Sequence, residues 1–401
     1  MSEIIFILYI ERNDCYMSKV VIQECKEYSI ENMMVKLNDG IDKLGGWDSF
    51  VKQGNTVLLK VNLIGPKASD SAAVTNCEFV RAVTRILKAK GCTVWIGDSS
   101  GGAIAGIAPT AQSLKVAGLE KVASEEGAII KNFDREGVVE VQPQGKFKDK
   151  MYLAKPLFDA DVVINLPKLK THSAAIYTGA VKNVFGCIPG LRKAMYHKMA
   201  PDKEDFGEIL VDIHEGAKFV LHIMDGIVSM QGEGPTAGSP YNANKILMST
   251  DPLALDTVAI NMLGMTVDDI EVLSSAKKRN LGQYNLDKIN IDGDYNYIPL
   301  LKDYKLPKNY KSSKRRNSKA VIKVIDFFKT KPVINKKICK SCNMCVDSCP
   351  VNAIDKDTKY IDYTKCIECM CCHELCLHKA VDLKKDNILA AIIAKFSLKG
   401  R

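Results

Sequence analysis

Nine of the fourteen cysteines in this chain lie in one short stretch, between Cys339 and Cys376. Eight of them form two copies of the pattern Cys-x2-Cys-x2-Cys-x3-Cys. The first copy is Cys339, Cys342, Cys345 and Cys349, and the second is Cys366, Cys369, Cys372 and Cys376. Three closely spaced thiolates can hold three irons of a cubane, and the fourth cysteine of each copy points to the other cluster. The pattern therefore predicts two [4Fe–4S] clusters.

Because the fourth cysteine of each copy belongs to the other cluster, each predicted cluster has four ligands. The first cluster takes Cys339, Cys342, Cys345 and Cys376, and the second takes Cys366, Cys369, Cys372 and Cys349. Zinc is the alternative occupant, because zinc also binds Cys-x2-Cys pairs. Zinc gives no reason for a third cysteine at the same spacing, so iron–sulfur chemistry is favoured. The predicted fold of this region is a small α+β ferredoxin-like domain.

The second copy departs from the pattern at two positions. Cys371 is an extra thiol beside Cys372, and Leu377 stands where a proline would be expected. We interpret Cys371 as a bystander, and the alternative is that it replaces a neighbouring ligand. The nearby His373 and His378 are interpreted as surface residues and not as ligands.

The rest of the chain indicates a protein of the cytoplasm. With 401 residues, of which 46% are hydrophobic, the chain is too long for one small domain. The apolar run Ile4–Ile10 is too short and too charged at its flanks for a secretory signal. No stretch approaches the roughly 20 apolar residues of a membrane span. We therefore expect a reducing, cytoplasmic compartment and no membrane partner.

Strand-like and helix-like segments alternate before the cysteine region. Strands are predicted at Val20–Cys25, Thr56–Val61, Cys92–Ile96, Ala160–Leu166, Phe219–Met224 and Lys245–Ser249. Helices are predicted at Asn76–Lys90 and Phe206–Ala217, and from an N-cap at Asp251 to Leu263. This alternation predicts an α/β domain, a mostly parallel sheet flanked by helices, over residues 18–300.

The remaining segments complete the predicted domain organisation. Residues 1–17 are expected to be a dispensable extension, residues 301–331 a basic linker, residues 332–382 the iron–sulfur domain and residues 383–401 a C-terminal helix. Much of the net charge of +9 lies between Lys302 and Lys340. A solvated linker is the favoured interpretation, because no aromatic residues are interleaved as in a nucleic-acid site. The alternative is a docking strip for an acidic protein or nucleic acid.

Polar clusters follow several predicted strands of the α/β domain. They are Lys60–Asn62, Gly97–Ser100, Lys168–His172, Lys182 with Asn183, Asp225, Gly232–Gly238 and Asp251. The carboxyl ends of strands form the ligand crevice in open α/β sheets. We expect Lys168, Lys170 and His172, in a polar loop, to face Asp98 and the Gly232–Gly238 loop. Such a site would bind a small anionic substrate and shuttle a proton, whereas Asp251 is favoured as an N-cap.

Three segments of the chain resemble those of a known family. They are Val163–His172, Thr178–Asn183 and Asp251–Asp256, and Gly97–Ser99 and Asp225–Gly238 also fit. The family is the one catalogued as domain of unknown function 362, and many members carry a C-terminal ferredoxin-type domain. The resemblance covers nearly everything from Met17 to Cys376. It implies an iron–sulfur protein with an electron-transfer function, but it brings little mechanism.

Two functional hypotheses follow from the sequence. The favoured one is a ferredoxin-type electron-transfer protein that exchanges electrons with a small anionic substrate or a redox partner at the α/β domain. The alternative is a non-enzymatic redox sensor or scaffold whose basic linker binds nucleic acid or an acidic protein. A polar crevice around Lys168, Lys170 and His172 favours the first hypothesis.

Overall fold

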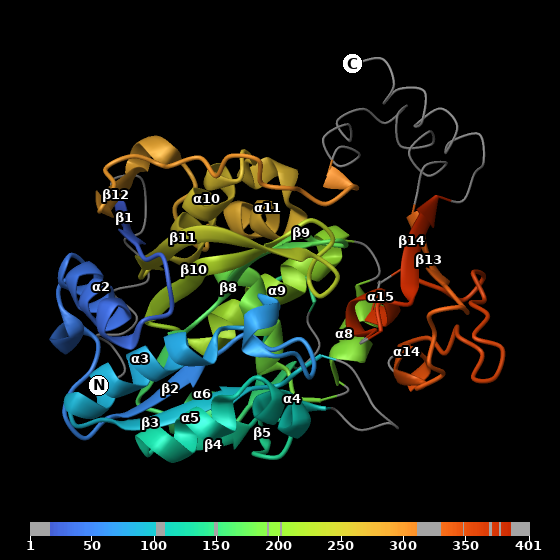
Figure 1. The fold of residues 1–401 in the computed structure, drawn as a ribbon, viewed down its shortest axis with the longest axis horizontal. Coiled ribbons are helices and arrows are strands. Elements are labelled where there is room, and N and C mark those ends of the chain that lie inside the picture. Colours follow the sequence, from blue (N-terminus) through green and yellow to red (C-terminus); the bar gives the residue numbers. More distant parts are fainter. Residues whose placement is uncertain are drawn as a thin grey trace.

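The computed structural model describes residues 17–101, 109–147, 151–190, 192–200, 203–310, 330–347, 349–368, 371–376 and 378–385. Figure 1 shows a large domain built around one sheet and a small module, coloured orange to red, at its side. Residues 1–16 of the predicted extension and residues 386–401 of the predicted C-terminal helix lie outside the described residues, whereas residues 383–385 of that predicted helix are the end of a strand, β14 (Val381–Lys385).

Ten strands form the sheet of the large domain. Eight follow the order β12-β1-β11-β10-β7-β2-β3-β4, and β8 pairs with both β10 and β9. Their bounds are β1 Ser18–Glu24, β2 Thr56–Lys60, β3 Thr93–Asp98, β4 Ile129–Asn132, β7 Val162–Asn165, β8 Lys168–His172, β9 Ile176–Thr178, β10 Leu221–Gln231, β11 Ser239–Ser249 and β12 Ile289–Gly293. Among the described strands of this sheet, every antiparallel pair includes β11 or β9. The predicted α/β fold with a mostly parallel sheet is confirmed.

Helices cover both faces of this sheet (Figure 1). One face carries α2 Ile30–Asp42, α3 Cys77–Ala89, α4 Thr110–Val116 and α5 Leu119–Glu126. The other carries α6 Pro156–Asp159, α7 Ala180–Asn183, α8 Arg192–Met199, α9 Lys203–Ala217, α10 Pro252–Met262 and α11 Glu271–Lys278. Residues of β2 alternate between the two cores, since Leu58 joins one and Leu59 the other. In the described ranges no helix is long and apolar enough to cross a bilayer.

Short elements complete the large domain. They are the 3-10 helices η1 Trp47–Ser49, η2 Ser69–Ser71, η3 Val184–Cys187, η4 Val267–Asp269 and η5 Leu286–Lys288, and the strands β5 Val138–Val141 and β6 Met151–Ala154 of a separate two-stranded sheet.

Two predicted helix starts depend on side-chain caps that the structure contains. The Asn76 side chain accepts a hydrogen bond from the Glu78 backbone N–H at the start of α3. Asp251 accepts hydrogen bonds from the backbone N–H groups of Leu253 and Ala254, at 3.0 and 2.9 Å, at the start of α10. Each cap satisfies helix N–H groups that have no partner inside the helix. Asp251 is therefore an N-cap, as favoured from the sequence.

The strands predicted at Phe219–Met224 and Lys245–Ser249 are longer than expected. The first continues to Gln231 as β10, and the second begins at Ser239 as β11. The two strands pair antiparallel from His222 with Ser249 to Gln231 with Ser239. The Gly232–Gly238 loop is thus the turn of a hairpin. The sequence prediction stopped early because the added residues mix polar and apolar side chains, and such a mixture is a weaker signal than a continuous apolar run.

The segment after residue 300 continues to pack on the large domain. Leu301, Tyr304 and Leu306 lie against its core, and Tyr310 is buried within it. Residues 301–310 therefore belong with the large domain in space, whereas the predicted linker continues beyond them through residues 311–329, which lie outside the described ranges.

The first and last strands of the small module pair with each other. β13 (Thr330–Ile334) pairs antiparallel with β14 (Val381–Lys385), so the two ends of the module lie together. Two short helices, α14 (Met344–Asp347) and α15 (Cys371–Leu375), lie between these strands in sequence. Ile354 and Ile361 form an isolated antiparallel bridge and join its small core.

Candidate functional site

Four cysteines of the small module line one cavity, which we call the first cavity. They are Cys339, Cys342, Cys345 and Cys376, and the cavity holds about 340 Å³ of space, part of it open to solvent. Cys345 lies in α14, whereas Cys376 comes from the second copy of the pattern and follows α15. The cavity thus gathers the four cysteines that the spacing assigns to the first cluster.

A second cavity in the module holds about 320 Å³. Its lining includes Cys349, Cys366, Cys371 and Cys372. Cys349 comes from the first copy of the pattern and the other three from the second copy. Cys369, the remaining ligand predicted for the second cluster, lies outside the described residues.

The internal repeat of the sequence relates the two cavities. The same spacing along the chain relates Cys339 to Cys366, Cys345 to Cys372, Cys349 to Cys376, and Ala353 to Ala380. Each of these residues lines one cavity and its equivalent lines the other. The backbone repeats as well, since the N–H groups of Cys339 and Cys366 donate to the carbonyls of Asn335 and Asp362. The module therefore has an approximate two-fold symmetry.

Backbone N–H groups donate hydrogen bonds to several of the sulfur atoms. The Ala353 N–H donates to Cys349 Sγ at 3.2 Å, and the Ala380 N–H donates to Cys376 Sγ at 3.1 Å. Such bonds stabilise thiolates and adjust the reduction potential of iron–sulfur clusters. Burial raises the pKa of Cys345 to about 11, so a bound cation is needed to hold this sulfur as a thiolate near neutral pH.

The extra cysteine, Cys371, has an equivalent residue in the first copy of the repeat. Its equivalent in the first copy is Met344, and both side chains are buried and line their respective cavities. A methionine at the equivalent position shows that this site belongs to the apolar packing of the module. This observation supports the bystander interpretation of Cys371.

The donor set fits an iron–sulfur cluster. All four donors of the first cavity are sulfur atoms, which suit tetrahedral iron. In the part of the chain that the structure describes, no group of three or more His, Cys, Asp or Glu side chains is arranged to hold a single metal ion. That finding concerns one ion, whereas each thiolate of a cubane binds a different iron atom.

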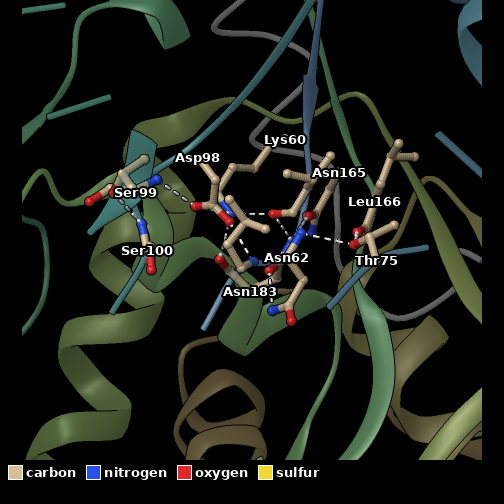
Figure 2. Close-up of polar contacts among 12 residues, drawn as sticks. Lys60, Asn62, Thr75, Asp98, Ser99, Ser100, Asn165, Leu166 and Asn183 are labelled. Carbon is tan, nitrogen blue, oxygen red and sulfur yellow. Dashed lines mark hydrogen bonds and ion pairs between the residues drawn. The ribbon is translucent and has the colours of Figure 1, made fainter. Parts of the chain in front are cut away.

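A buried ion pair lies at the carboxyl ends of β2 and β3 in the large domain (Figure 2). Lys60 Nζ is 2.9 Å from Asp98 Oδ1, and the two side chains are 0% and 1% exposed. The Leu63 N–H donates to the other oxygen of Asp98 at 2.8 Å. Burial raises the pKa of Asp98, and the positive charge of Lys60 opposes that rise.

Three asparagines continue this polar network, as Figure 2 shows. Asn62 donates to the Asn183 side chain at 2.8 Å, and Asn183 donates to the Asn165 side chain at 2.7 Å. Asn165 in turn donates to the Ala180 carbonyl and to Nδ1 of the buried His222. The amides therefore connect the ends of β2, β7 and α7 in one hydrogen-bonded chain.

The predicted polar loop Lys168–His172 is in fact the buried strand β8. All five of its side chains are buried, and β8 pairs with β10 on one side and with β9 on the other. Lys168 Nζ lies 2.7 Å from Asp225 Oδ2, and burial lowers the pKa of this lysine. Lys170 Nζ donates to Asn62 Oδ1 and to the Ala73 carbonyl, both at 2.6 Å. Lys168 therefore pairs with Asp225, and Asp98 pairs with Lys60.

The far end of β8 contacts the small module. Ser173 Oγ and His373 Nε2 share a hydrogen bond at 3.3 Å, and His373 Nδ1 donates to the Val381 carbonyl. The interpretation of His373 as a surface residue is wrong, because its side chain is buried. His378 is exposed and lines the first cavity. The Ser173 N–H also donates to the Gly234 carbonyl, so the Gly232–Gly238 loop meets this end of β8.

A third polar cluster follows β3. Ser99 Oγ donates to Asp134 Oδ1 and accepts from Lys193 Nζ, each at 2.5 Å. The Gly190 N–H donates to Asp134 Oδ1 at 2.6 Å. Burial lowers the pKa of Lys193 to about 8, and the charge of Asp134 opposes that change.

The sequence analysis missed several of these residues. Asn165 and His222 lie inside strands that read as apolar. Asp134 and Lys193 are far in sequence from Ser99, and Tyr28 is far in sequence from Lys168, whose Nζ donates a hydrogen bond to the Tyr28 hydroxyl at 2.9 Å. One signal was present, since a polar Asn165 in an otherwise apolar run must find a hydrogen-bond partner when it is buried.

Two protein families match parts of this chain. The family described as a domain of unknown function matches residues 57–261, and a 4Fe–4S binding domain matches residues 332–355. The second match contains the whole first copy of the cysteine pattern.

Two curated proteins are similar to the chain. A thylakoid-associated protein of Synechocystis is 32% identical over 270 residues, which are 65% of this chain and 79% of that protein. The pyruvate synthase subunit PorD of Methanothermobacter marburgensis is 38% identical over 57 residues, which are 14% of this chain and 69% of that subunit.

Two solved structures share a weaker likeness. A protein from Thermotoga maritima has a TM-score of 0.37 at 15% identity, with 57% of each chain covered. The lactate racemase apoprotein from Thermoanaerobacterium thermosaccharolyticum has a TM-score of 0.38 at 12% identity, with 62% of this chain covered. The chain spans 57% of the length of each of these two structures.

Proposed function

Since the chain belongs to the family of domain of unknown function 362 and carries a 4Fe–4S binding domain, we propose that it transfers electrons between two [4Fe–4S] clusters and a small anionic substrate at the α/β domain. The cysteine lining of two equivalent cavities supports the number of clusters. When bound, the clusters supply one-electron oxidation and reduction. The residues of the chain hold them and supply hydrogen bonds to the sulfur atoms.

The observation that carries this proposal is the contact between Ser173 and His373. His373 directly follows Cys372, which lines the second cavity, and Ser173 directly follows His172 at the end of β8. The iron–sulfur module therefore sits against the edge of the sheet where polar side chains gather. An electron carrier that serves a substrate at that edge needs this proximity.

The charge of the same edge supports an anionic substrate. Burial, together with the positive charges of Lys182 and Lys170, holds the pKa of His172 well below its usual value. A carboxylate or phosphate bound there would interact favourably with these groups.

A cytoplasmic location is part of the proposal. Cys25, Cys77, Cys92 and Cys187 are free thiols in the structure, although the chain is rich in cysteine. Free thiols and thiolate-bound clusters both suit a reducing compartment.

Anaerobic purification followed by metal analysis tests the proposal. We expect about eight irons and about eight sulfides per chain, in line with two cubanes. Replacing Cys345 or Cys372 by serine would each remove about half of the iron, because each lines a different cavity. Electron paramagnetic resonance of the reduced protein would then show whether both clusters accept an electron. Stoichiometric zinc in colourless protein would rule the proposal out.

A further inference from the structure

The two cavities of the small module differ at three pairs of equivalent positions. The spacing that relates the two copies of the cysteine pattern also relates Lys340 to Ile367, Pro332 to Lys359 and Val351 to His378. In each pair the basic residue lines the first cavity, and the apolar residue lines the second cavity. The repeat has therefore kept the cysteines of the two cavities alike but not the charge around them.

The backbone of the two copies is the same, so these positions are equivalent in space as well as in sequence. Ser341 and Glu368, which are equivalent, have φ values of 51° and 54°. Asn352 and Lys379, which are also equivalent, have φ values of 50° and 53°. A positive φ is uncommon outside glycine, so its repetition at both pairs shows that the two copies follow one conformation. The cavities thus differ in side chains and not in their backbone.

The same two pairs add to the difference in charge. Glu368 lies between two cysteines of the second copy, where the first copy has the neutral Ser341. Lys379 follows Cys376, which lines the first cavity, whereas its equivalent Asn352 is neutral. The first cavity therefore has additional positive charge in its surroundings, and the second has an additional negative charge.

Lys359 is the least exposed of the lysines around the first cavity. It is 7% exposed, and its Nζ donates a hydrogen bond to the Lys356 carbonyl. The pKa of Asp355 is lowered by hydrogen bonds from Thr358 and, to a smaller extent, by the charge of Lys359. Asp355 is itself exposed, so water screens its charge more than that of the buried Lys359. The net charge that this pair presents to the cavity is positive.

The large domain brings one more lysine to the first cavity. Burial lowers the pKa of Lys67, in the loop after β2, and the charge of Lys379 lowers it further, whereas Cys376 raises it. Lys67 therefore lies close to both of these residues of the small module. The first cavity is thus the one that the large domain approaches with a positive charge.

We propose that Lys340 and Lys359 give the first cavity the cluster of higher reduction potential, so that a single electron added to the module resides there. This inference rests on the proposed function for the presence of two clusters. Positive charge near a cluster favours its reduced form, which carries one more negative charge, and the acidic Glu368 has the opposite effect in the second copy. The electron is thereby held near Cys376 and Lys67, on the side of the large domain.

A redox titration of the anaerobic full-length protein, followed by electron paramagnetic resonance, tests the order of reduction. We expect two one-electron steps that differ more than tenfold in equilibrium constant, which is about 59 mV in potential. Lys359→Met should lower the potential of the upper step by about the same amount and leave the lower step unchanged. Lys384→Met is the matched control, because Lys384 is exposed and lines neither cavity. A shift of the lower step in Lys359→Met, or equal shifts in the two variants, would overturn the proposal.

Exchange of side chains between the cavities gives a second test that does not alter a buried residue. Lys340 is exposed and Ile367 is its equivalent, so neither substitution disturbs the core of the module. Lys340→Ile should lower the upper step, Ile367→Lys should raise the lower step, and the double variant should bring the two steps together. If neither substitution moves the expected step, the charge of the lining does not set the order.

Iron analysis of the same preparations separates this inference from the proposed function. A protein that binds much less than about eight irons would contradict the presence of two clusters. About eight irons with a single reduction potential would contradict the inference alone, because both clusters would then be present and equal.

Discussion

Lys60 Nζ lies 2.9 Å from Asp98 Oδ1 in an ion pair from which solvent is almost fully excluded. Replacing Lys60 by methionine would leave the Asp98 carboxylate buried without its counter-charge. We expect the free energy of unfolding to fall by about 3–5 kcal/mol, as for other broken buried pairs. Denaturant unfolding followed by the fluorescence of Trp47 and Trp95 measures this loss.

An exposed pair in the same domain provides the control. Lys90 lies 2.7 Å from Asp48, whose side chain is 90% exposed. Lys90→Met should change the free energy of unfolding by no more than about 1 kcal/mol. Similar losses in the two variants would mean that the Lys60 pair is no more important than a surface contact.

Serine substitutions at Cys371 and Cys372 should have opposite outcomes. Cys371 corresponds in the repeat to Met344, so Cys371→Ser should leave the iron content unchanged. Cys372 corresponds to Cys345, so Cys372→Ser should remove about half of the iron. Iron analysis of the two anaerobic preparations decides the matter, and a loss of iron in Cys371→Ser would make Cys371 a ligand.

The Ser173–His373 contact should couple the small module to the large domain. In a double-mutant cycle of Ser173→Ala and His373→Ala, we expect a coupling energy of about 0.5–1.5 kcal/mol in the free energy of unfolding. The same cycle with His378→Ala is the control, because His378 is exposed and should not couple to Ser173. Additive effects in the first cycle would contradict the contact.

Asp256 should make the stability of the large domain depend on pH. Its carboxyl group accepts hydrogen bonds from the N–H groups of Ala180 and Val181, at the start of α7, and from the Tyr177 hydroxyl. Burial raises its pKa from 3.8 to about 7. The folded protein therefore holds a proton that the unfolded chain releases at lower pH. The stability this provides is complete below about pH 4 and is lost as the pH rises through about 7.

Comparison with an Asp256→Asn variant isolates this contribution. The free energy of unfolding of the unchanged protein should fall between about pH 5 and pH 8, beyond the fall seen in the variant. The variant should also be less stable throughout, because the asparagine N–H₂ group would face a backbone N–H. Parallel pH profiles would show that Asp256 is already ionised at pH 5.

Local patterns predicted the parts of the fold that depend on nearby residues. Asn76 and Asp251 cap helices through N–H groups two or three residues away, so the sequence around them was sufficient. The cysteine spacing grouped the same residues that line the first cavity. These features can be predicted from a short segment of the sequence without knowing what the rest of the chain does.

Contacts between distant residues could not be predicted in this way. Lys168 and Lys170 read as a polar loop because nothing near them explains a buried lysine. Their burial depends on Asp225 and Asn62, which come from other strands and loops. The length of β10 likewise depends on pairing with β11. A sequence pattern reports the periodicity of one segment and not the identity of its partner.

The crossed cysteines have a consequence for how the small module originated. Each copy of the pattern supplies most of the lining thiols of one cavity and one thiol of the other, so neither copy alone completes a cavity. Two separate chains, each with one copy, would complete each other around a two-fold axis, with the same surface used by both partners. The module thus has the form expected when the gene of a self-complementary dimer is duplicated and fused.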